Sequence, residues 1–528
     1  MKDDLAKLIS FIDAGGLSRR SFMTRTAAFG ATAAVGATFA AGKVMADEPK
    51  RGGVLIVGLG GGATTDTLDP GPAPSSVPGM ANMQWGETLV YVTPDGGIQP
   101  RLCESYSANE DATEWTFVIR QGVKFHDGTE MTANDVLQTY KRHSDENSQS
   151  AALGIMKGIA DMSVDGNNLT LKLTTGNVDL PYLLGDYHLV VQPNGGFDNP
   201  TAAIGTGPYK LVSAEMGVRY VFERFQEDWD QNRGFYDGVE IIVINDSTAR
   251  NAALQSGQVH MINRVETKVA KLLGGTAGIT VTNTSGRGHY VFVMFTDTPP
   301  FDNNDLRLAL KYSINRQEMV DKILDGYGSI GNDTPINAAY PLFDDSLEQR
   351  PFDLEKAAEH YKASGHDGSP IELYVAEAGF PGATDAATLW AASANSAGIP
   401  LTIVKVPDDG YWSDIWNVKP FVASYWGGRP VQDQMYSTAY LSTAEWNDTH
   451  FRNEEFDALL LQARGEADPA VRKELYGKMA RIMWETGGLV CPMFNDFVEA
   501  HSDAVGGWIS YPNQEMMNFL APSMTWMA

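Results

Sequence analysis

Small residues that follow the first apolar run have a spacing that is found in nucleotide-binding sites. In "GGVLIVGLGGGATTDTLDP", residues 52–70, Gly58, Gly60 and Ala63 stand at the spacing of the dinucleotide fingerprint G-x-G-x-x-G/A. That fingerprint works when a helix begins at once, because the helix N-terminus then approaches the pyrophosphate. Here four prolines follow within residues 70–78 and predict an extended loop. No Gly-Lys-Ser/Thr completes a P-loop either, so the stretch predicts a strand that ends in a glycine turn.

Motifs of the common secreted hydrolases are absent from the sequence. Neither H-E-x-x-H nor G-x-S-x-G occurs, and neither cysteine is paired locally with a histidine. Asp66 and Asp69 are compatible with a glycosidase-like pair, but no further motif supports one. His126 and Asp127 in "FHDG" form a dyad that we expect to hold a turn. The sequence therefore predicts no catalytic residue, and a secreted hydrolase is the remote alternative.

The first 46 residues resemble an export signal. An arginine pair at residues 19–20 precedes a mildly apolar Ala/Gly-rich stretch, which resembles the twin-arginine class. The small-residue site at residues 44–46 places the cut before Asp47. An N-terminal anchor is the alternative, but the apolar stretch is shorter than the roughly 20 residues of a membrane span. We expect residues 1–46 to be removed and the mature chain to be soluble in the periplasm.

Composition excludes several classes of partner. The chain has 66 Asp and Glu against 40 Lys and Arg, a net charge of −26. Such a chain repels nucleic acid and anionic lipid. Cys103 and Cys491 lie far apart in apolar contexts, which favours two buried residues over a disulfide. The nine histidines are spread singly, so we predict no metal and no cofactor. At 528 residues the chain is too long for one core and suggests about three folding units.

Strand and helix patterns alternate irregularly and predict a mixed α/β protein. Residues 114–125 alternate apolar and polar side chains, which is typical of a half-buried strand. Thr132 and Asp135 form a capping-box pattern that starts a helix through Lys141. The other predicted elements are a strand over 169–175, a hairpin with its turn near 215–217, an amphipathic helix pair over 303–326 and a helix over 468–488.

Five stretches of the chain, taken in order, resemble one family. They are residues 52–70, residues 100–142 with "KFHDG" before a capped helix, "GTGPY" at 205–209, residues 299–328 and residues 451–483. This series resembles the extracytoplasmic solute-binding proteins that serve ABC importers of peptides, nickel complexes and related solutes. The resemblance spans nearly the whole mature chain.

The resemblance implies an α/β fold of the large, peptide-binding periplasmic type, with two lobes, a cleft between them and an additional domain. The implied division is a signal at 1–46, lobe I at 47–85, 205–290 and 490–528, the additional domain at 86–204, and lobe II at 291–489. The glycine turn then lies at the cleft edge, where missing side chains let a ligand or the opposing lobe approach, or it is a mobile surface loop.

Residues 408–435 hold the ingredients of a ligand site. Aromatic side chains grip a ligand with little loss of rotamer freedom, and this stretch is rich in them. We interpret Trp412 and Trp416 as core. Tyr425 and Trp426 differ because they lead directly into Gly-Gly-Arg-Pro, the end of a strand followed by a turn. In the family that this chain resembles, ligand contacts cluster there.

One position departs from the family's pattern. Peptide-binding members carry an Asp close after the Trp, which pairs with the α-amino group of the ligand. This chain has Arg429 three residues after Trp426, and Asp433 is a candidate to take over the amine. If Arg429 points into the cleft, its planar fork suits a carboxylate or phosphate. We predict a ligand with an anionic group there; the alternative is a surface arginine in a turn.

Three further positions complete the candidate site. Arg287 and His289 precede a strand near the predicted crossover between the lobes, where the family places polar ligand contacts. We interpret His289 as a polar residue and not a metal ligand, because no second His or Cys lies at ligand spacing. Trp85 resembles a position close to the cleft, with core packing as the alternative.

These observations predict a binding protein. It captures a peptide or peptide-like anionic or zwitterionic solute and delivers it to the membrane permease of an ABC importer with its cytoplasmic ATPase. An opine-like acid, a nickel chelate or haem are alternative solutes. We expect a monomer that closes its lobes on the ligand, driven only by contacts that are better in the closed state.

Overall fold

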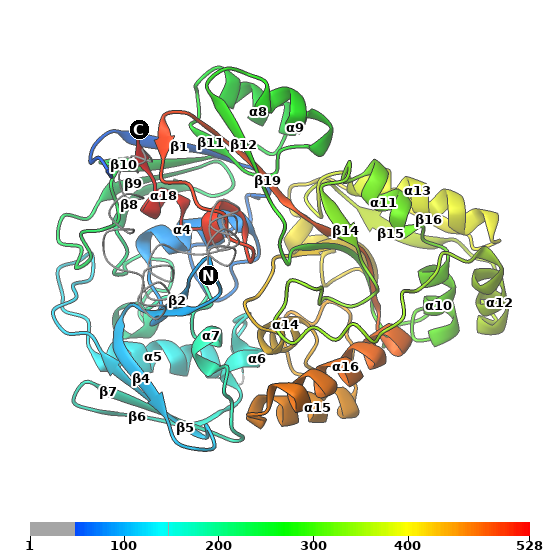
Figure 1. Cartoon of the computed structure of the whole chain (residues 1–528), viewed down its shortest axis with the longest axis horizontal. Coiled ribbons are helices and arrows are strands. Elements are labelled where there is room, and N and C mark those ends of the chain that lie inside the picture. Colours follow the sequence, from blue (N-terminus) through cyan, green and yellow to red (C-terminus); the bar gives the residue numbers. More distant parts are fainter. Residues whose placement is uncertain (1–47, 146) are drawn as a thin grey trace, which may run out of the picture. The chain divides into compact units, whose positions relative to one another are not determined.

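The computed structural model describes residues 48–145 and 147–528. The predicted export signal and its cleavage site lie outside the described residues. By their contacts, Pro49–Ala528 form one unit. Three larger sheets and two small two-stranded ones organise it (Figure 1).

A seven-stranded mixed sheet contains the first strand of the chain. β1 is parallel to both of its neighbours, and the other pairs are antiparallel. The order is β12 (Ile279–Thr284), β19 (Phe497–Ser502), β11 (Met261–Ile262), β1 (Val54–Leu59), β10 (Gly238–Val243), β9 (Arg219–Arg224) and β8 (Tyr209–Glu215).

A six-stranded sheet holds most of the second half of the chain. β15 is parallel to both of its neighbours, and the other pairs are antiparallel. The order is β14 (Gly328–Ile330), β18 (Leu489–Asn495), β13 (His289–Met294), β17 (Phe421–Trp426), β15 (Ile371–Val375) and β16 (Leu401–Lys405).

The remaining strands form an antiparallel four-stranded sheet and two small pairs. The four-stranded order is β4 (Cys103–Ala108), β5 (Glu114–Ile119), β7 (Asn168–Leu173) and β6 (Ile159–Asp165). The pairs are β2 (Val90–Val92) with β3 (Ile98–Pro100), and β20 (Val505–Gly506) with β21 (Trp526–Met527).

Helices cover these sheets. Their bounds are α4 (Ser76–Trp85), α5 (Ala133–Ser144), α6 (Leu153–Met156), α7 (Leu180–Leu183), α8 (Ser247–Gln255), α9 (Thr267–Gly274), α10 (Asn304–Tyr312), α11 (Arg316–Lys322), α12 (Leu354–Ser364), α13 (Ala383–Ser396), α14 (Gln432–Ala439), α15 (Glu454–Gly465), α16 (Pro469–Thr486), α17 (Glu515–Asn518) and α18 (Ala521–Met524), with single turns η1 (Pro193–Gly196) and η2 (Tyr411–Ile415).

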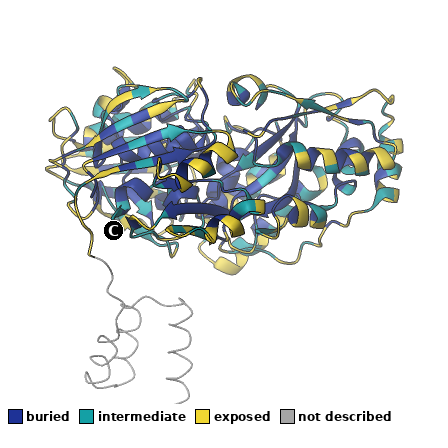
Figure 2. Cartoon of the chain, turned by 90° about the horizontal axis from the view of Figure 1, so that it is seen from above, coloured by how far each residue is buried: buried dark blue, intermediate teal, exposed yellow. Residues whose placement is uncertain are grey.

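The six-stranded sheet is buried on both faces. In β13, Val291 and Val293 pack with α14, α15 and α16, whereas Phe292 and Met294 pack with α10 to α13. This follows from the period of two along a strand, which sends successive side chains to opposite faces. Figure 2 shows the result as buried strands beneath helices that expose their outer faces.

Two short connections join the seven-stranded and six-stranded sheets. β12 ends at Thr284 and β13 begins at His289, while β18 ends at Asn495 and β19 begins at Phe497. β12 pairs with β19 and β13 pairs with β18, so both chain segments run side by side through the crossing. The predicted domain limits at 290 and 490 fall inside β13 and β18; the division into domains itself stays a prediction.

Most predicted elements are confirmed, with two errors. The strand expected over 114–125 ends at Ile119 in β5, and the turn that follows contains Gly122 with a φ of 72°. The capping box is present, because Thr132 N and Oγ1 donate to Asp135 Oδ2 over 2.8 and 2.7 Å at the start of α5. The prediction of an extended loop is wrong beyond Ser75, since α4 begins at Ser76. Pro78 lies in the first turn of that helix, where a missing N–H costs nothing.

Candidate functional site

An aromatic cavity with an empty volume of about 410 Å³ lies between the end of β17, the segment before α4 and the C-terminal segment. Seven of its thirteen lining residues are aromatic, namely Tyr187, Trp412, Trp416, Tyr425, Trp426, Trp446 and Phe519. The others are Pro74, Ser75, Ser76, Gly427, Arg429 and Gln514. Such a lining offers apolar area with a few polar groups, the usual composition of a small-molecule site.

The tryptophans reach the cavity from β17 and from the loops around it. The turn η2 carries Trp412, and Tyr411 fixes that turn by donating its hydroxyl to the Ala423 carbonyl over 2.7 Å. Trp412 packs edge-on against Trp416 and Tyr425, with ring centroids 5.8 and 5.4 Å apart. Edge-to-face pairs of this kind stabilise a fixed arrangement of rings. Trp412 and Trp416, interpreted from the sequence as core, therefore also form a wall of the cavity.

One buried carboxyl group orients two of these rings. Asp448 is fully buried, and its Oδ2 accepts hydrogen bonds from Trp416 Nε1 at 3.0 Å and from Trp426 Nε1 at 3.2 Å. Burial raises the pKa of Asp448 to about 7, against the opposing effect of the indole N–H groups. Because a carboxyl oxygen accepts in either protonation state, both indoles stay anchored across neutral pH.

Arg429 is the one charged residue among the described residues that line the cavity. Its side chain is 5% exposed, and its Nη1 donates to the carbonyls of Gly427 and Gly428 at 3.2 Å. Its Nε lies 3.7 Å from Asp186 Oδ2, beyond hydrogen-bond distance. That Nε is buried and has no hydrogen-bond partner within the described part of the chain.

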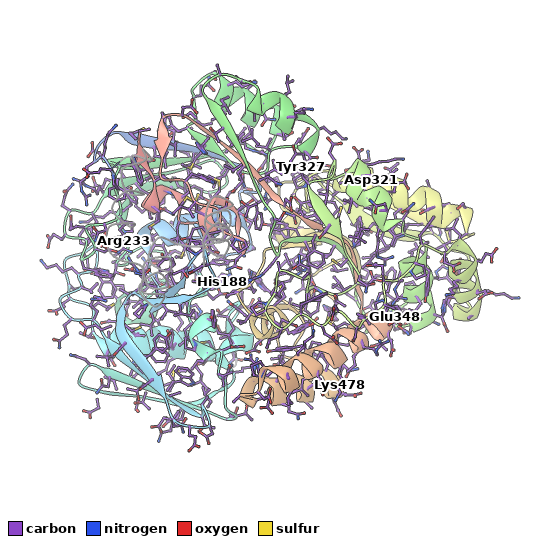
Figure 3. All side chains as sticks on the ribbon, in the orientation of Figure 1. His188, Arg233, Asp321, Tyr327, Glu348 and Lys478 are labelled. Carbon is purple, nitrogen blue, oxygen red and sulfur yellow. The ribbon has the colours of Figure 1, made fainter. Side chains whose placement is uncertain are left out.

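The carboxylate of Asp186 already contacts two other side chains. His188 Nδ1 lies 2.5 Å from Asp186 Oδ1, and Gln434 Nε2 donates to Oδ2 over 2.9 Å. Burial raises the pKa of Asp186, but His188 and then Arg429 outweigh this and hold it below its usual range. His188, labelled in Figure 3, also has Nε2 3.1 Å from the Ala73 carbonyl. Asp186 is therefore engaged by His188 and Gln434, and Arg429 Nε stays beyond hydrogen-bond distance from it.

The predicted residues Tyr425, Trp426 and Arg429 line the cavity together. Tyr425 OH lies 3.4 Å from Ser76 Oγ, and the guanidinium of Arg264 stacks 4.4 Å from the Tyr425 ring centroid. β17 thus meets the segment before α4 at this point.

Asp433 does not line the cavity. It is fully buried at the start of α14, where Arg464 Nε donates to Oδ1 over 2.7 Å and Asn177 Nδ2 donates to Oδ2 over 3.1 Å. Ser437 Oγ adds a third donor at 2.8 Å. Its charge is therefore compensated inside the protein, and it is not placed to receive an amine from the cavity.

Arg287 and His289 lie behind the cavity wall. Arg287 donates to the carbonyls of Ala339, Arg429 and Pro430 over 2.9–3.1 Å and to Asn513 Oδ1 over 2.7 Å, so it fixes the loop that carries Arg429. His289 is fully buried with Nδ1 3.1 Å from the Arg287 carbonyl, and burial lowers its pKa to about 4. Both are positioned to support the loop and are not among the lining residues.

Trp85 packs in the core beneath the seven-stranded sheet. Its side chain is fully buried at the end of α4, and it is not among the lining residues. The chain of "GTGPY" lies against it, because a Cβ at Gly205 would approach the Trp85 carbonyl to 2.4 Å. This arrangement favours the alternative interpretation of Trp85, in which its side chain packs in the core.

The glycine turn after β1 approaches two guanidinium groups of the protein. A Cβ at Gly60 would come within 2.6 Å of Arg250 Nη1, and one at Gly61 within 2.8 Å of Arg264 Nη1. Just beyond it, Thr64 Oγ1 donates to Asp409 Oδ1 over 2.9 Å, so this loop contacts the segment before η2. The space above the glycines is filled by the protein's own arginines.

A left-handed turn holds Phe519 against the cavity. Met516, Met517, Asn518 and Phe519 have φ values of 53°, 58°, 59° and 66°. Asn518 N donates to the Gln514 carbonyl at 3.2 Å and Phe519 N to the Glu515 carbonyl at 3.0 Å. Residues other than glycine adopt this conformation at a cost of roughly 1–2 kcal/mol each, so the surrounding packing maintains it. The sequence "NQEMMNF" contains no glycine and gave no signal for this turn.

Several other lining residues were not predicted from the sequence either. Trp446 and Tyr187 come from loops without a recognisable pattern, and Gln514 precedes the left-handed turn. No group of three or more His, Cys, Asp and Glu side chains among residues 48–145 and 147–528 is placed to hold a metal ion. Within the same residues, no helix is long and apolar enough to cross a membrane.

Comparisons with known proteins identify the family of this chain. The family described as bacterial extracellular solute-binding proteins, family 5 Middle, matches residues 97–448. The glutathione-binding protein GsiB of Salmonella typhi is 24% identical over 483 residues, which cover 86% of this chain and 92% of that protein.

Solved structures show the same fold. AgaA from A. tumefaciens R10 in complex with agropinic acid has a TM-score of 0.82 at 24% identity, covering 90% of this chain and 99% of that one. DppA from Helicobacter pylori with the peptide STSA has a TM-score of 0.82 at 20% identity, covering 90% and 98%. These likenesses confirm the predicted α/β fold of the large peptide-binding type. The chain therefore belongs to family 5 of the bacterial extracellular solute-binding proteins, which bind solutes for ABC importers and are not enzymes.

Proposed function

We propose that this protein captures a small peptide-like solute that carries an anionic group, and delivers it to the permease of an ABC importer. The anionic group binds Arg429, and the aromatic side chains around the cavity enclose the rest of the solute. The similar proteins named above bind glutathione, agropinic acid or a peptide, which supports a solute of this kind.

The observation that carries the proposal is the unpartnered Nε of Arg429. A buried N–H without an acceptor costs free energy, and an oxyanion of the ligand removes that cost. The nearest carboxylate, that of Asp186, lies 3.7 Å from Arg429 Nε and already has His188 and Gln434 as hydrogen-bond partners. A ligand carboxylate therefore gains a charge-assisted hydrogen bond from a buried guanidinium.

Contacts between the two larger sheet regions support a closing mechanism. Thr64 with Asp409 and Ser76 with Tyr425 join loops of the seven-stranded sheet to loops of the six-stranded sheet. We infer that these sheets are the cores of lobes I and II and that residues 86–204 form the additional domain. A ligand favours the closed form only by the contacts that it makes better there, and the permease recognises that form.

The remaining parts of the proposal concern export and assembly. The twin-arginine-like signal directs export, and the protein acts in the periplasm as a monomer after cleavage before Asp47. An opine-like acid is the second candidate solute, favoured by the same unpartnered Nε because it too presents a carboxylate. A nickel chelate or haem remains a weaker alternative.

Thermal unfolding of purified residues 47–528 tests this function. The panel comprises di- to pentapeptides, their amidated forms, opine-type acids, nickel with histidine, and haem. A ligand at 100 times its dissociation constant adds about 2.7 kcal/mol, which raises the midpoint by several degrees. We expect a rise with free acids that is lost on amidation.

Arg429→Gln keeps the bulk of the side chain and removes the charge. We expect it to weaken binding of the stabilising acid at least tenfold. Arg481→Ala, an exposed arginine paired with Glu348, is the matched control and leaves affinity unchanged. Equal affinity in Arg429→Gln and the wild type would refute the anion site.

A further inference from the structure

We propose that this site selects carboxylic acids whose nitrogen carries no charge, such as N-acylated amino acids and dipeptides or their lactams. Solutes with a free ammonium group bind more weakly. The inference rests on the proposed function, because it assumes that the carboxylate binds Arg429. It adds the chemical class of the rest of the solute.

The first argument is the charge of the lining. Arg429 is the only charged residue among the described lining residues, so no carboxylate faces the cavity. Three acidic side chains packed close behind it are engaged elsewhere. Asp186 pairs with His188 and Gln434, Asp448 accepts from two indoles, and Glu515 pairs with Arg264 and Asn263.

The second argument is the type of polar atom left free. Arg429 Nε and Trp412 Nε1 belong to lining residues and are buried without a hydrogen-bond partner among the described residues. Both are N–H groups, which can only donate. Their complement is a set of acceptors, which a carboxylate and an amide carbonyl supply. An ammonium group supplies donors only.

The third argument is the cost of burying an ammonium here. A buried charge requires a counter-charge or several acceptors, and the fixed charge that faces this cavity is positive. Acylation removes the charge and adds a carbonyl acceptor in one step.

The test compares matched pools on purified residues 47–528. One pool contains dipeptides with free termini, a second contains the same dipeptides N-acetylated, and a third is N-acetylated and C-terminally amidated. Native mass spectrometry, with all peptides at the same concentration, identifies which members of each pool bind. We expect N-acetylated acids to bind at least tenfold more tightly than their free-ammonium counterparts, and amidation to abolish binding.

The outcomes separate the two proposals. Free-ammonium dipeptides that bind equally well or better, and lose binding on amidation, would overturn the inference and leave the proposed carboxylate site intact. Amidated members that bind as well as the acids would overturn the carboxylate site itself. Binding by neither acid pool would also overturn the inference, because the class that it names is then rejected.

A single substitution should reverse the preference. Gln514→Glu places a carboxylate in the lining with almost no change of volume, because Gln514 is a lining residue next to Gly427 and Gly428. We expect the ratio of N-acetylated to free-ammonium affinity to fall at least tenfold. Gln258→Glu adds the same charge at an exposed position and is the control. An unchanged ratio in Gln514→Glu would contradict the inference even if the variant binds more weakly overall.

Discussion

Two buried arginines of this protein differ in how their charge is partnered. Arg233, labelled in Figure 3, donates Nη1 and Nη2 to Glu87 over 2.7 and 2.9 Å, and Nε and Nη2 to Asp228 over 2.9 Å. Its fork is satisfied by two carboxylates. Arg429 is similarly buried, but its Nη1 contacts only neutral carbonyls and its Nε has no partner in the described chain.

The carboxyl groups of the two regions differ in the same way. Burial raises the pKa of Glu87, but Arg233 and Arg101 outweigh this and lower it, so Glu87 is charged and paired. Asp448 has no cationic partner among the groups that shift its pKa, and burial raises that pKa to about 7. Glu87 and Arg233 thus compensate each other's charge at hydrogen-bond distance, whereas Arg429 Nε lies 3.7 Å from Asp186 and makes no hydrogen bond within the described chain.

The largest effect expected from this contrast is on stability. Arg233→Ala leaves Glu87 and Asp228 buried without their main partner and should lower the free energy of unfolding by about 3–5 kcal/mol, measured by urea denaturation. Arg219→Ala, which breaks an exposed pair with Glu240, should cost no more than about 1 kcal/mol. If Arg233→Ala lowers the free energy of unfolding by less than about 1 kcal/mol, Arg233 does not support the fold through its two carboxylates. If that variant does not fold, Arg233→Lys keeps the charge and should lie between the two.

Asp448→Asn should change how stability depends on pH. Because the folded pKa is raised from 3.8 to about 7, the protonated carboxyl stabilises the fold fully below pH 3.8, and this contribution is lost as pH rises to about 7. The wild type should therefore lose stability relative to Asp448→Asn between pH 4 and 7, by on the order of 2–4 kcal/mol. Urea denaturation of both proteins at each pH measures the difference. Parallel curves would show that Asp448 is charged throughout.

Arg429→Gln should separate binding from stability. The acid-over-amide preference of the ligand should fall from at least tenfold to about one, while the free energy of unfolding falls by less than about 1.5 kcal/mol. Calorimetric titration of both ligand forms, together with urea denaturation, gives the two numbers. A large loss of stability with the preference retained would place Arg429 in the same class as Arg233.

His188→Gln should have the smallest effect. A glutamine can still donate to Asp186, but it loses the contact of the ring with the Ala73 carbonyl, which should shift Asp186 relative to Arg429. We expect affinity for the anionic ligand to fall roughly threefold to tenfold, measured by titration at pH 7. His360→Gln, at a partly exposed position beside Asp305, is the control. Unchanged affinity would mean that Asp186 does not influence the binding charge.

Local patterns predicted elements whose cause is local. The capping box at Thr132, the helix from Asp468 and the hairpin near Gly217 each depend on residues within one or two turns, and all three are present. Pro78 misled the prediction for residues 76–79, because its place in the first turn depends on where α4 begins.

The site was only partly predictable because its roles depend on distant partners. Tyr425, Trp426 and Arg429 follow one another at a strand end, and they line the cavity together. Asp433 follows Arg429 by four residues in the sequence, yet it lies at the start of α14, where Arg464 of α15 engages it. Trp446 and Phe519 reach the cavity through loop and left-handed conformations that no local pattern specifies.

The left-handed turn at Met516–Phe519 makes mutational tolerance differ between neighbouring positions. Glycine removes the backbone penalty at each of them, but Met516, Met517 and Phe519 are buried, and the cavity that glycine leaves there costs about 2–5 kcal/mol, more than the strain that it relieves. Asn518 is only half-buried. Saturation mutagenesis selected for folding alone should therefore enrich glycine at position 518 and retain large apolar side chains at its three neighbours.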